Sequence, residues 1–94
     1  MTVKKIMSAT KGEFFRSLEH FAPGRAFDKT QTSFSFPAGE GQAEVSYRPL
    51  PDRQVTGLLS LPQLEVSIAF EGGSDPARTA FIDAFDLAFR RGGG

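Results

Sequence analysis

Few side chains in this sequence have the type and spacing that chemistry requires. His20 is the only histidine and the chain has no cysteine, so neither a second imidazole nor a thiolate is present to bind a metal ion together with it. Asp83 and Asp86 lie three residues apart on one turn of a predicted helix, which would suit an acid/base pair or a cation site. Their stripe of the helix is predicted to face water, however, and a solvated helix face explains both carboxylates. We therefore predict no catalytic residue, metal ligand or cofactor, and we expect that the chain is not an enzyme.

Two glycine-containing segments match binding motifs only in part. Gly39-Glu40-Gly41 begins like a phosphate-binding loop, but it lacks the third glycine of G-x-G-x-x-G and connects two predicted strands. Arg91 and residues 92–94 form a single copy of an arginine–glycine repeat. We interpret the first segment as a hairpin turn and the second as a helix end followed by a frayed tail.

Composition predicts one domain, residues 1–94, held together by packing alone. Without cysteine there can be no disulfide, and ten phenylalanines with one tyrosine and no tryptophan indicate a core of rings that need no hydrogen-bond partner. Eleven Lys and Arg residues balance eleven Asp and Glu residues. The resulting formal net charge of zero argues against nucleic acid or an anionic membrane as the partner.

The hydropathy of the chain predicts a cytoplasmic protein. No apolar segment approaches the roughly 20 residues that a membrane-spanning helix needs. The apolar run that follows Lys4 and Lys5 is too short for the hydrophobic region of a secretory signal.

Two helices are predicted. The first begins at Thr10–Glu13, which matches a capping box, continues through an apolar stripe that includes Phe14, Leu18 and Phe21, and ends at Pro23-Gly24. The second begins with Asp75 as N-cap and Pro76 at the first helical position. Its apolar stripe is Ala77, Phe81, Ala84, Phe85, Ala88 and Phe89.

Period-two patterns predict the strands. Four of them are expected between the helices, over residues 27–36, 42–49, 53–60 and 63–70, with turns at residues 38–41, 49–52 and 61–62. The last strand alternates without an error and places four core residues on one face: Leu64, Val66, Ile68 and Phe70. Residues 1–9 contain either a short first strand from Thr2 to Ser8 or an unstructured leader.

These elements predict an α+β fold of two layers. An antiparallel sheet of four or five strands would carry both helices on its apolar face, in the order (β)-α-β-β-β-β-α. With the first strand included, this order resembles the TATA-binding-protein-like topology and, more loosely, a shortened helix-grip domain. The likeness is topological and implies no functional residue.

Two segments carry a second resemblance. The G-L-L-S-L-P sequence of residues 57–62 and the glycine-rich end of residues 85–94 are similar to those of short uncharacterised bacterial proteins. The similarity covers roughly the C-terminal third of the chain and implies no activity.

Our first functional hypothesis concerns the predicted hairpin tip, where turns are usually polar. Here the apolar residues exceed what the sheet requires: Leu58, Leu59, Leu61 and Pro62. Either they fold back under a helix, which we favour, or they form an exposed apolar patch of the kind that marks an interface. In the second case they would bind a partner protein or a second copy of the chain, with edge-strand pairing as a further contribution.

The second hypothesis belongs to another class. A small apolar ligand would bind between the sheet and the helices, and the chain would act as a carrier or as an accessory domain of an enzyme. The residues that would line this pocket are Phe14, Phe21, Tyr47, Phe81 and Phe85. A completely filled interior is the alternative.

Overall fold

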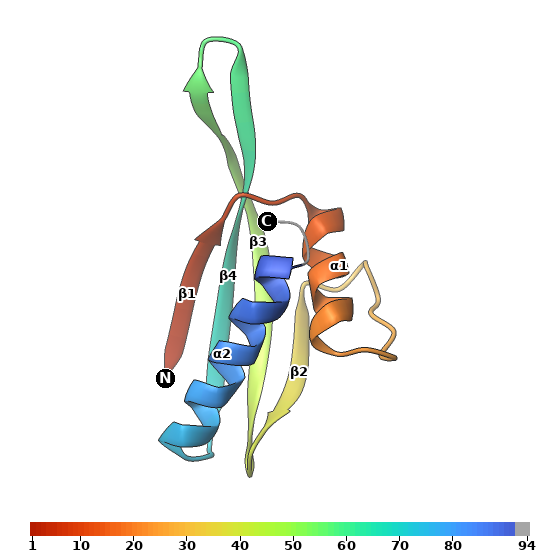
Figure 1. Cartoon of the computed structure of the whole chain (residues 1–94), viewed down its shortest axis with the longest axis vertical. Coiled ribbons are helices and arrows are strands. Elements are labelled where there is room, and N and C mark those ends of the chain that lie inside the picture. Colours follow the sequence, from red (N-terminus) through yellow and green to blue (C-terminus); the bar gives the residue numbers. More distant parts are fainter. Residues whose placement is uncertain (92–94) are drawn as a thin grey trace.

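The computed structural model describes residues 1–91 as one antiparallel sheet and two helices. In chain order the elements are β1 (Thr2–Met7), α1 (Lys11–Phe21), β2 (Ser33–Ala38), β3 (Gly41–Thr56), β4 (Leu59–Glu71) and α2 (Asp75–Arg91). The four strands lie in the spatial order β1-β4-β3-β2. Both helices cover the same face of this sheet (Figure 1). The α+β class and the antiparallel sheet with two helices are thus confirmed, and of the two alternatives for residues 1–9 the structure contains the strand.

The prediction of four strands between the helices was wrong. Residues 49–52, expected to form a turn, lie inside β3, and the segment beyond them belongs to the same strand. The chain reverses between Thr56 and Leu59, so the predicted turn at Leu61 and Pro62 lies inside β4 instead. The element order is therefore β-α-β-β-β-α, and the TATA-binding-protein-like topology is not confirmed.

The places of Pro49 and Pro51 in the sheet explain why β3 continues past these two residues. Tyr47 donates its backbone N–H to the carbonyl oxygen of Thr32 at 3.0 Å, toward the β2 edge. Successive residues of a regular strand direct their N–H groups to opposite edges, so Pro49 turns the same way as Tyr47. Pro51 lies in the register shift between Leu50 and Arg53, where it has no partner in the ladder. The pairing of β2 with β3 ends at Ser46, so no neighbouring strand requires the donors that these prolines lack.

Local hydrogen bonds fix where the helices begin. The predicted capping box is confirmed: Glu13 N–H donates to Thr10 Oγ1 at 3.2 Å, and Thr10 N–H donates to Glu13 Oε1 at 3.0 Å. The predicted N-cap of the second helix was one residue late. Ser74 Oγ accepts from the N–H of Ala77 at 3.3 Å, and Asp75 is already helical. The predicted tail, residues 92–94, lies outside the described residues.

The strand predicted over residues 27–36 begins later in the structure than expected. β2 begins only at Ser33, because Asp28 forms a local turn in which its Oδ1 accepts from the N–H of Thr30 at 2.9 Å and from the hydroxyl of the same residue at 2.6 Å. Such side-chain contacts compete with strand pairing. The strand also continues past residue 36, the predicted end: Pro37 pairs with Gln42 inside β2, which is an edge strand and tolerates proline.

The core lies between the sheet and the helices. The four residues predicted from the alternation of β4 are all buried, and Ala43, Val45 and Tyr47 of β3 join them. The helices contribute Phe14, Phe15, Leu18, Phe81, Phe85, Ala88 and Phe89. Rings pack edge to face or stacked, as in the Phe85–Phe89 pair with centroids 4.1 Å apart. The sheet face away from the helices carries mainly polar side chains.

Candidate interaction site

The central hairpin extends far beyond the rest of the sheet. β1 pairs with β4 only as far as Leu64, and β2 pairs with β3 only as far as Ser46. Residues 50–62 therefore form a two-stranded ribbon, which we call the arm, and the molecule measures 48 × 26 × 22 Å. Figure 1 shows the arm projecting past both helices. Residues 51–60 are all exposed, so the arm lies almost entirely in solvent.

The outer edges of the arm lack hydrogen-bond donors at several positions. Pro49, next to the base of the arm, turns its missing N–H group to the outer edge of β3, and Pro51 lies in the register shift between Leu50 and Arg53. On β4, Phe70 donates its N–H to the carbonyl oxygen of Met1 at 2.9 Å, so the even-numbered residues of this strand face the β1 edge. Pro62 is one of these, and its carbonyl oxygen accepts a hydrogen bond from Ser8 Oγ at 3.3 Å on that edge. Both edges are thus poor templates for another strand.

Thr56 organises the tip of the arm. Its Oγ1 accepts from the backbone N–H of Leu58 at 3.2 Å and from that of Leu59 at 3.1 Å. The side-chain amide of Gln54 donates to the Thr56 carbonyl oxygen. A single hydroxyl thus satisfies two backbone donors of the turn, which leaves the leucine side chains free to point outward.

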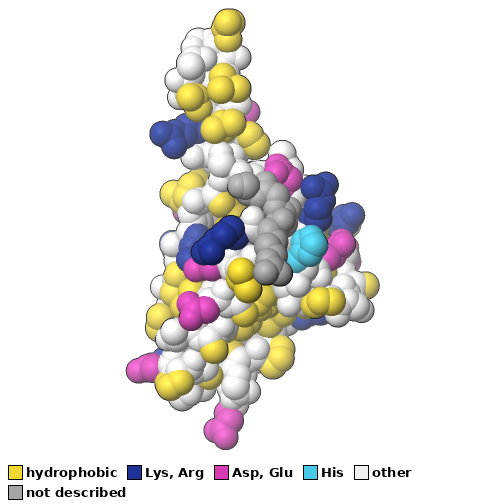
Figure 2. Space-filling view, in the orientation of Figure 1, with side chains coloured by type: hydrophobic (Ala, Val, Ile, Leu, Met, Phe, Trp, Pro, Cys, Tyr) yellow, Lys and Arg dark blue, Asp and Glu magenta, His cyan; other side chains and the backbone are white. Residues whose placement is uncertain are grey.

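The tip presents apolar surface to solvent. Leu58 is 102% exposed, and Val55 and Leu59 are 48% and 49% exposed. Figure 2 shows apolar side chains along the arm up to its end. Half of the six large hydrophobic residues that are exposed within residues 1–91 lie in this short segment. Exposed apolar side chains in such a cluster are typical of protein interfaces.

The four residues predicted at the tip occupy different parts of the arm. Leu58 and Leu59 lie at its end, so the burial that we favoured for them was wrong. Leu61 is half-buried and pairs with Arg53 in the middle of the arm, and Pro62 is half-buried at the base. The reason is that no helix reaches the end of the hairpin (Figure 1).

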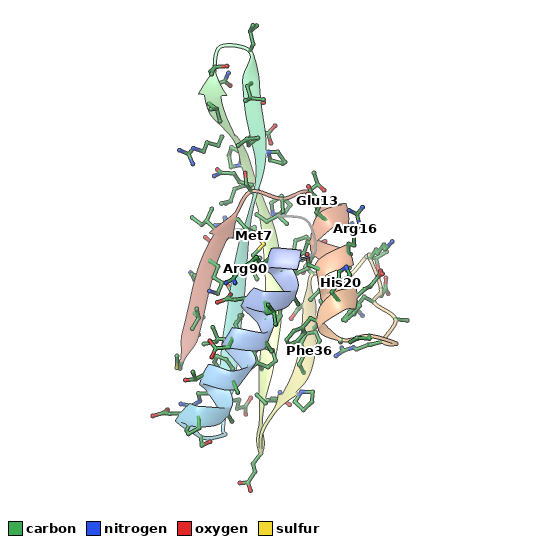
Figure 3. All side chains as sticks on the ribbon, viewed as in Figure 1. Met7, Glu13, Arg16, His20, Phe36 and Arg90 are labelled. Carbon is green, nitrogen blue, oxygen red and sulfur yellow. The ribbon has the colours of Figure 1, made fainter. Side chains whose placement is uncertain are left out.

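A partly open cavity of about 230 Å³ lies at the base of the arm. Its lining comes from the end of β1, the β1–α1 connection, α1 and α2, and is mainly apolar: Met7, Ser8, Ala9, Glu13, Phe14, Ser17 and Phe89. Met7 and Glu13 lie at the end of the molecule's body from which the arm projects (Figure 3). The contact between Ser8 and Pro62 joins this cavity to the arm.

The five residues predicted to line a ligand pocket pack on one another in the core. Phe14 and Tyr47 have ring centroids 4.5 Å apart, and Phe21 lies 5.0 Å from Phe81 and 5.6 Å from Phe85. Phe14 also lines the cavity at the base of the arm, whereas Phe21 and Phe81 line two separate surface depressions. The residues of this set that border cavities therefore border different ones.

The polar candidates have local partners or face solvent. His20 and Asp83 are exposed, and Asp86 forms an ion pair with Lys5 of β1, with Nζ and Oδ1 3.0 Å apart. No group of three His, Asp or Glu side chains in residues 1–91 is arranged to hold a metal ion. The backbone N–H of Thr10 holds the pKa of Glu13 below its ordinary value, and the Thr10 hydroxyl adds to this effect. This carboxylate at the rim of the cavity is therefore ionised at neutral pH.

The sequence interpretation missed the arm as an element, together with Val55 at its tip and Ser8 at its base. A usable signal was present in the spacing of Pro49 and Pro51. Two prolines two residues apart in a strand turn toward the same edge, which is compatible with a strand that has a solvent-exposed edge.

No helix within residues 1–91 is long and apolar enough to cross a membrane. The resemblance to short bacterial proteins stays a prediction from the sequence. Searches against protein-family models, curated proteins and solved structures find no match to this chain.

Proposed function

We propose that this chain is a non-enzymatic interaction module that binds another protein, or a second copy of itself, through the end of its arm. The contact residues would be Leu58 and Leu59, with Leu61 and Pro62 extending the surface toward the base. The observation that carries this proposal is the complete exposure of Leu58 at the end of a projecting ribbon. A leucine in that place contributes nothing to the core, and its burial by a partner would be worth about 1.5 to 3 kcal/mol.

Energetics of the ribbon support the same proposal. A two-stranded hairpin without a third strand or a covering helix is only marginally stable in water. The arm gains its order from the sheet at its base and from Thr56 at its tip. A partner that covered Val55, Leu58 and Leu59 would supply the packing that the arm lacks.

The experiment is a comparison of the wild type with a Leu58→Ser/Leu61→Ser double variant. Both proteins would be used as baits in an extract of the cells that naturally express the chain, and the captured proteins identified by mass spectrometry. Loss of the captured proteins with an unchanged circular-dichroism spectrum is expected. A Leu87→Ser variant is the matched control, because Leu87 is 47% exposed on α2 and lies off the arm. Identical captures by wild type and double variant would remove the proposal.

A small apolar ligand is the second candidate, favoured by the cavity at the base of the arm. Its volume of about 230 Å³ lies below the 300 to 1,000 Å³ typical of ligand pockets, so only a small compound would fit. Native mass spectrometry of the purified protein would reveal such a compound as an added mass.

For the fold, the order β1-β4-β3-β2 with two helices on one face supports a TATA-binding-protein-like arrangement with one strand fewer.

A further inference from the structure

The chain carries both a protruding apolar side chain, at the end of the arm, and an apolar cavity in the body beside the base of the arm. Leu58 lies at the end of the arm, and the cavity of about 230 Å³ lies at its base, lined by Met7, Phe14 and Phe89 among others. An apolar cavity of about 150 Å³ is large enough for a benzene-sized group. A leucine side chain therefore fits the cavity by size and by chemistry.

We propose, on the basis of the proposed function above, that the partner is a second copy of this chain, and that Leu58 of each copy inserts into the cavity of the other. The two arms lie antiparallel to each other in a dimer with twofold symmetry.

The position of the cavity allows two copies to form a closed dimer, in which no contact site is left free. Ser8 lines the cavity and donates to the carbonyl oxygen of Pro62, so the cavity adjoins the point where the arm begins. Two arms of equal length, laid antiparallel, bring each tip to the base of the other. The two contacts are then equivalent by symmetry, and no unsatisfied tip or cavity remains to recruit a third copy.

The edges of the arms favour contact through side chains. Pro62 removes a backbone donor from the outer edge of β4, Pro49 removes one from the outer edge of β3 next to the arm, and Pro51 lies in a register shift, so two arms cannot pair as regular strands at these positions. Insertion of a side chain requires no such donors. This distinguishes the dimer from one built by strand addition.

Charge does not oppose the contact between two copies. The arm itself is neutral, because Asp52 lies next to Arg53 and both side chains are exposed. The net charge of zero also leaves no overall repulsion between the copies.

The test uses the absence of native cysteine. A Leu58→Cys chain and a Ser8→Cys chain are mixed in equal amounts and oxidised gently, and linked dimers are separated on a non-reducing gel and identified by mass spectrometry. We expect at least about tenfold more mixed dimer than in a mixture of the Leu58→Cys chain with a Glu40→Cys chain. Glu40 is an exposed residue in the β2–β3 turn, at the other end of the sheet. Equal yields in the two mixtures, or links mainly between two Leu58→Cys chains, would overturn the proposed geometry.

Sedimentation equilibrium tests the dimer without a cross-link. Wild type is expected to dimerise, and Leu58→Ser to raise the dissociation constant about a hundredfold or more because both tips lose their apolar contact. The Leu87→Ser control should leave the constant unchanged. A wild type that stays monomeric up to about millimolar concentration overturns the dimer. If its captured partners still depend on Leu58 and Leu61, the proposed function survives that result, whereas captures that do not depend on them remove the proposed function instead.

Discussion

In the capping box of α1, one residue, Glu13, makes the stability of the fold depend on pH. Glu13 accepts a hydrogen bond from the backbone of Thr10, which stabilises the ionised carboxylate in the folded state. Its pKa is therefore lower in the folded chain than in the unfolded chain. The resulting stabilisation is present above the ordinary glutamate pKa of about 4.3 and is lost as the pH falls through the lower folded pKa.

A Glu13→Gln variant should remove this dependence on pH. Glutamine keeps an acceptor for the Thr10 N–H but does not titrate, so the wild type should be the more stable protein at pH 7. The difference should shrink steadily as the pH falls below about 4. Urea denaturation of both proteins between pH 7 and pH 2.5 measures it. Asp28, whose pKa is also lowered through its bonds with Thr30, is present in both proteins and cancels in the comparison. A difference that stays constant with pH would contradict the assignment.

Individual residues were predicted well where one local rule decides their position. The capping box and the alternation of Leu64 to Phe70 each depend on a few neighbouring residues, and both were confirmed. Asp28 was misread because its side chain forms a turn that the period-two pattern does not reveal. The exposure of Leu58 could not be predicted either, because it depends on how far the helices reach along the hairpin.

At the scale of elements, two turns at one end of the sheet approach each other closely. A Cβ atom added at Gly41, in the first position of β3, would lie 2.5 Å from the Glu71 carbonyl oxygen and 2.5 Å from the carbonyl carbon of Gly72. These are backbone atoms, which cannot move away as the end of a flexible side chain could. Gly41 thus allows the β2–β3 turn to pack against the connection from β4 to α2.

Replacing Gly41 with alanine should therefore destabilise the fold by about 2 kcal/mol or more. Gly57 in the arm's turn is the matched control, since a Cβ atom there would have nothing within 4 Å. A Gly57→Ala variant should stay within about 0.5 kcal/mol of the wild type. Urea denaturation of the two variants distinguishes them. Equal stabilities would mean that the close approach at Gly41 relaxes without cost.

The number of strands between the helices was predicted wrongly because proline is compatible with two different places, a turn and the outer edge of a sheet. Pro49 and Pro51 suggested a turn, since proline cannot donate to a central ladder. The structure places Pro49 on an outer edge and Pro51 in a register shift, and neither place requires a donor. Only the pairing partners of β3 distinguish these two cases, and those partners are set by the spatial order of the sheet, which a single sequence does not provide.

Across the whole molecule, the arm is separable from the body. Residues 50–62 include no buried side chain, and the core lies entirely between the remaining sheet and the helices. Leu50 pairs with Gln63 at the base of the arm, which is a suitable closing pair for a short hairpin. The fold class could be predicted from the sequence because it depends on the sheet and helices that enclose the core. The proposed site could not, because it depends on the arm that extends from them.

Replacing residues 51–62 by Asn-Gly should therefore leave the fold intact. We expect the free energy of unfolding to change by less than about 1 kcal/mol, because no core contact is lost. The denaturant slope should fall slightly, since less surface is exposed on unfolding. Any association measured for the wild type should disappear. Loss of cooperative unfolding in this shortened protein would show that the arm is required for the fold.

The two prolines of the arm, together with Pro49 beside it, affect whether copies of the chain could assemble into a fibre. An exposed apolar ribbon with two donor-bearing edges could add one copy after another and grow into a fibre of indefinite length. Proline at 49, 51 and 62 interrupts such growth on both sides. A substitution of Pro49 or Pro62 would leave the core untouched and yet restore a backbone donor to an outer edge, so these two prolines protect against fibre formation without contributing to the core.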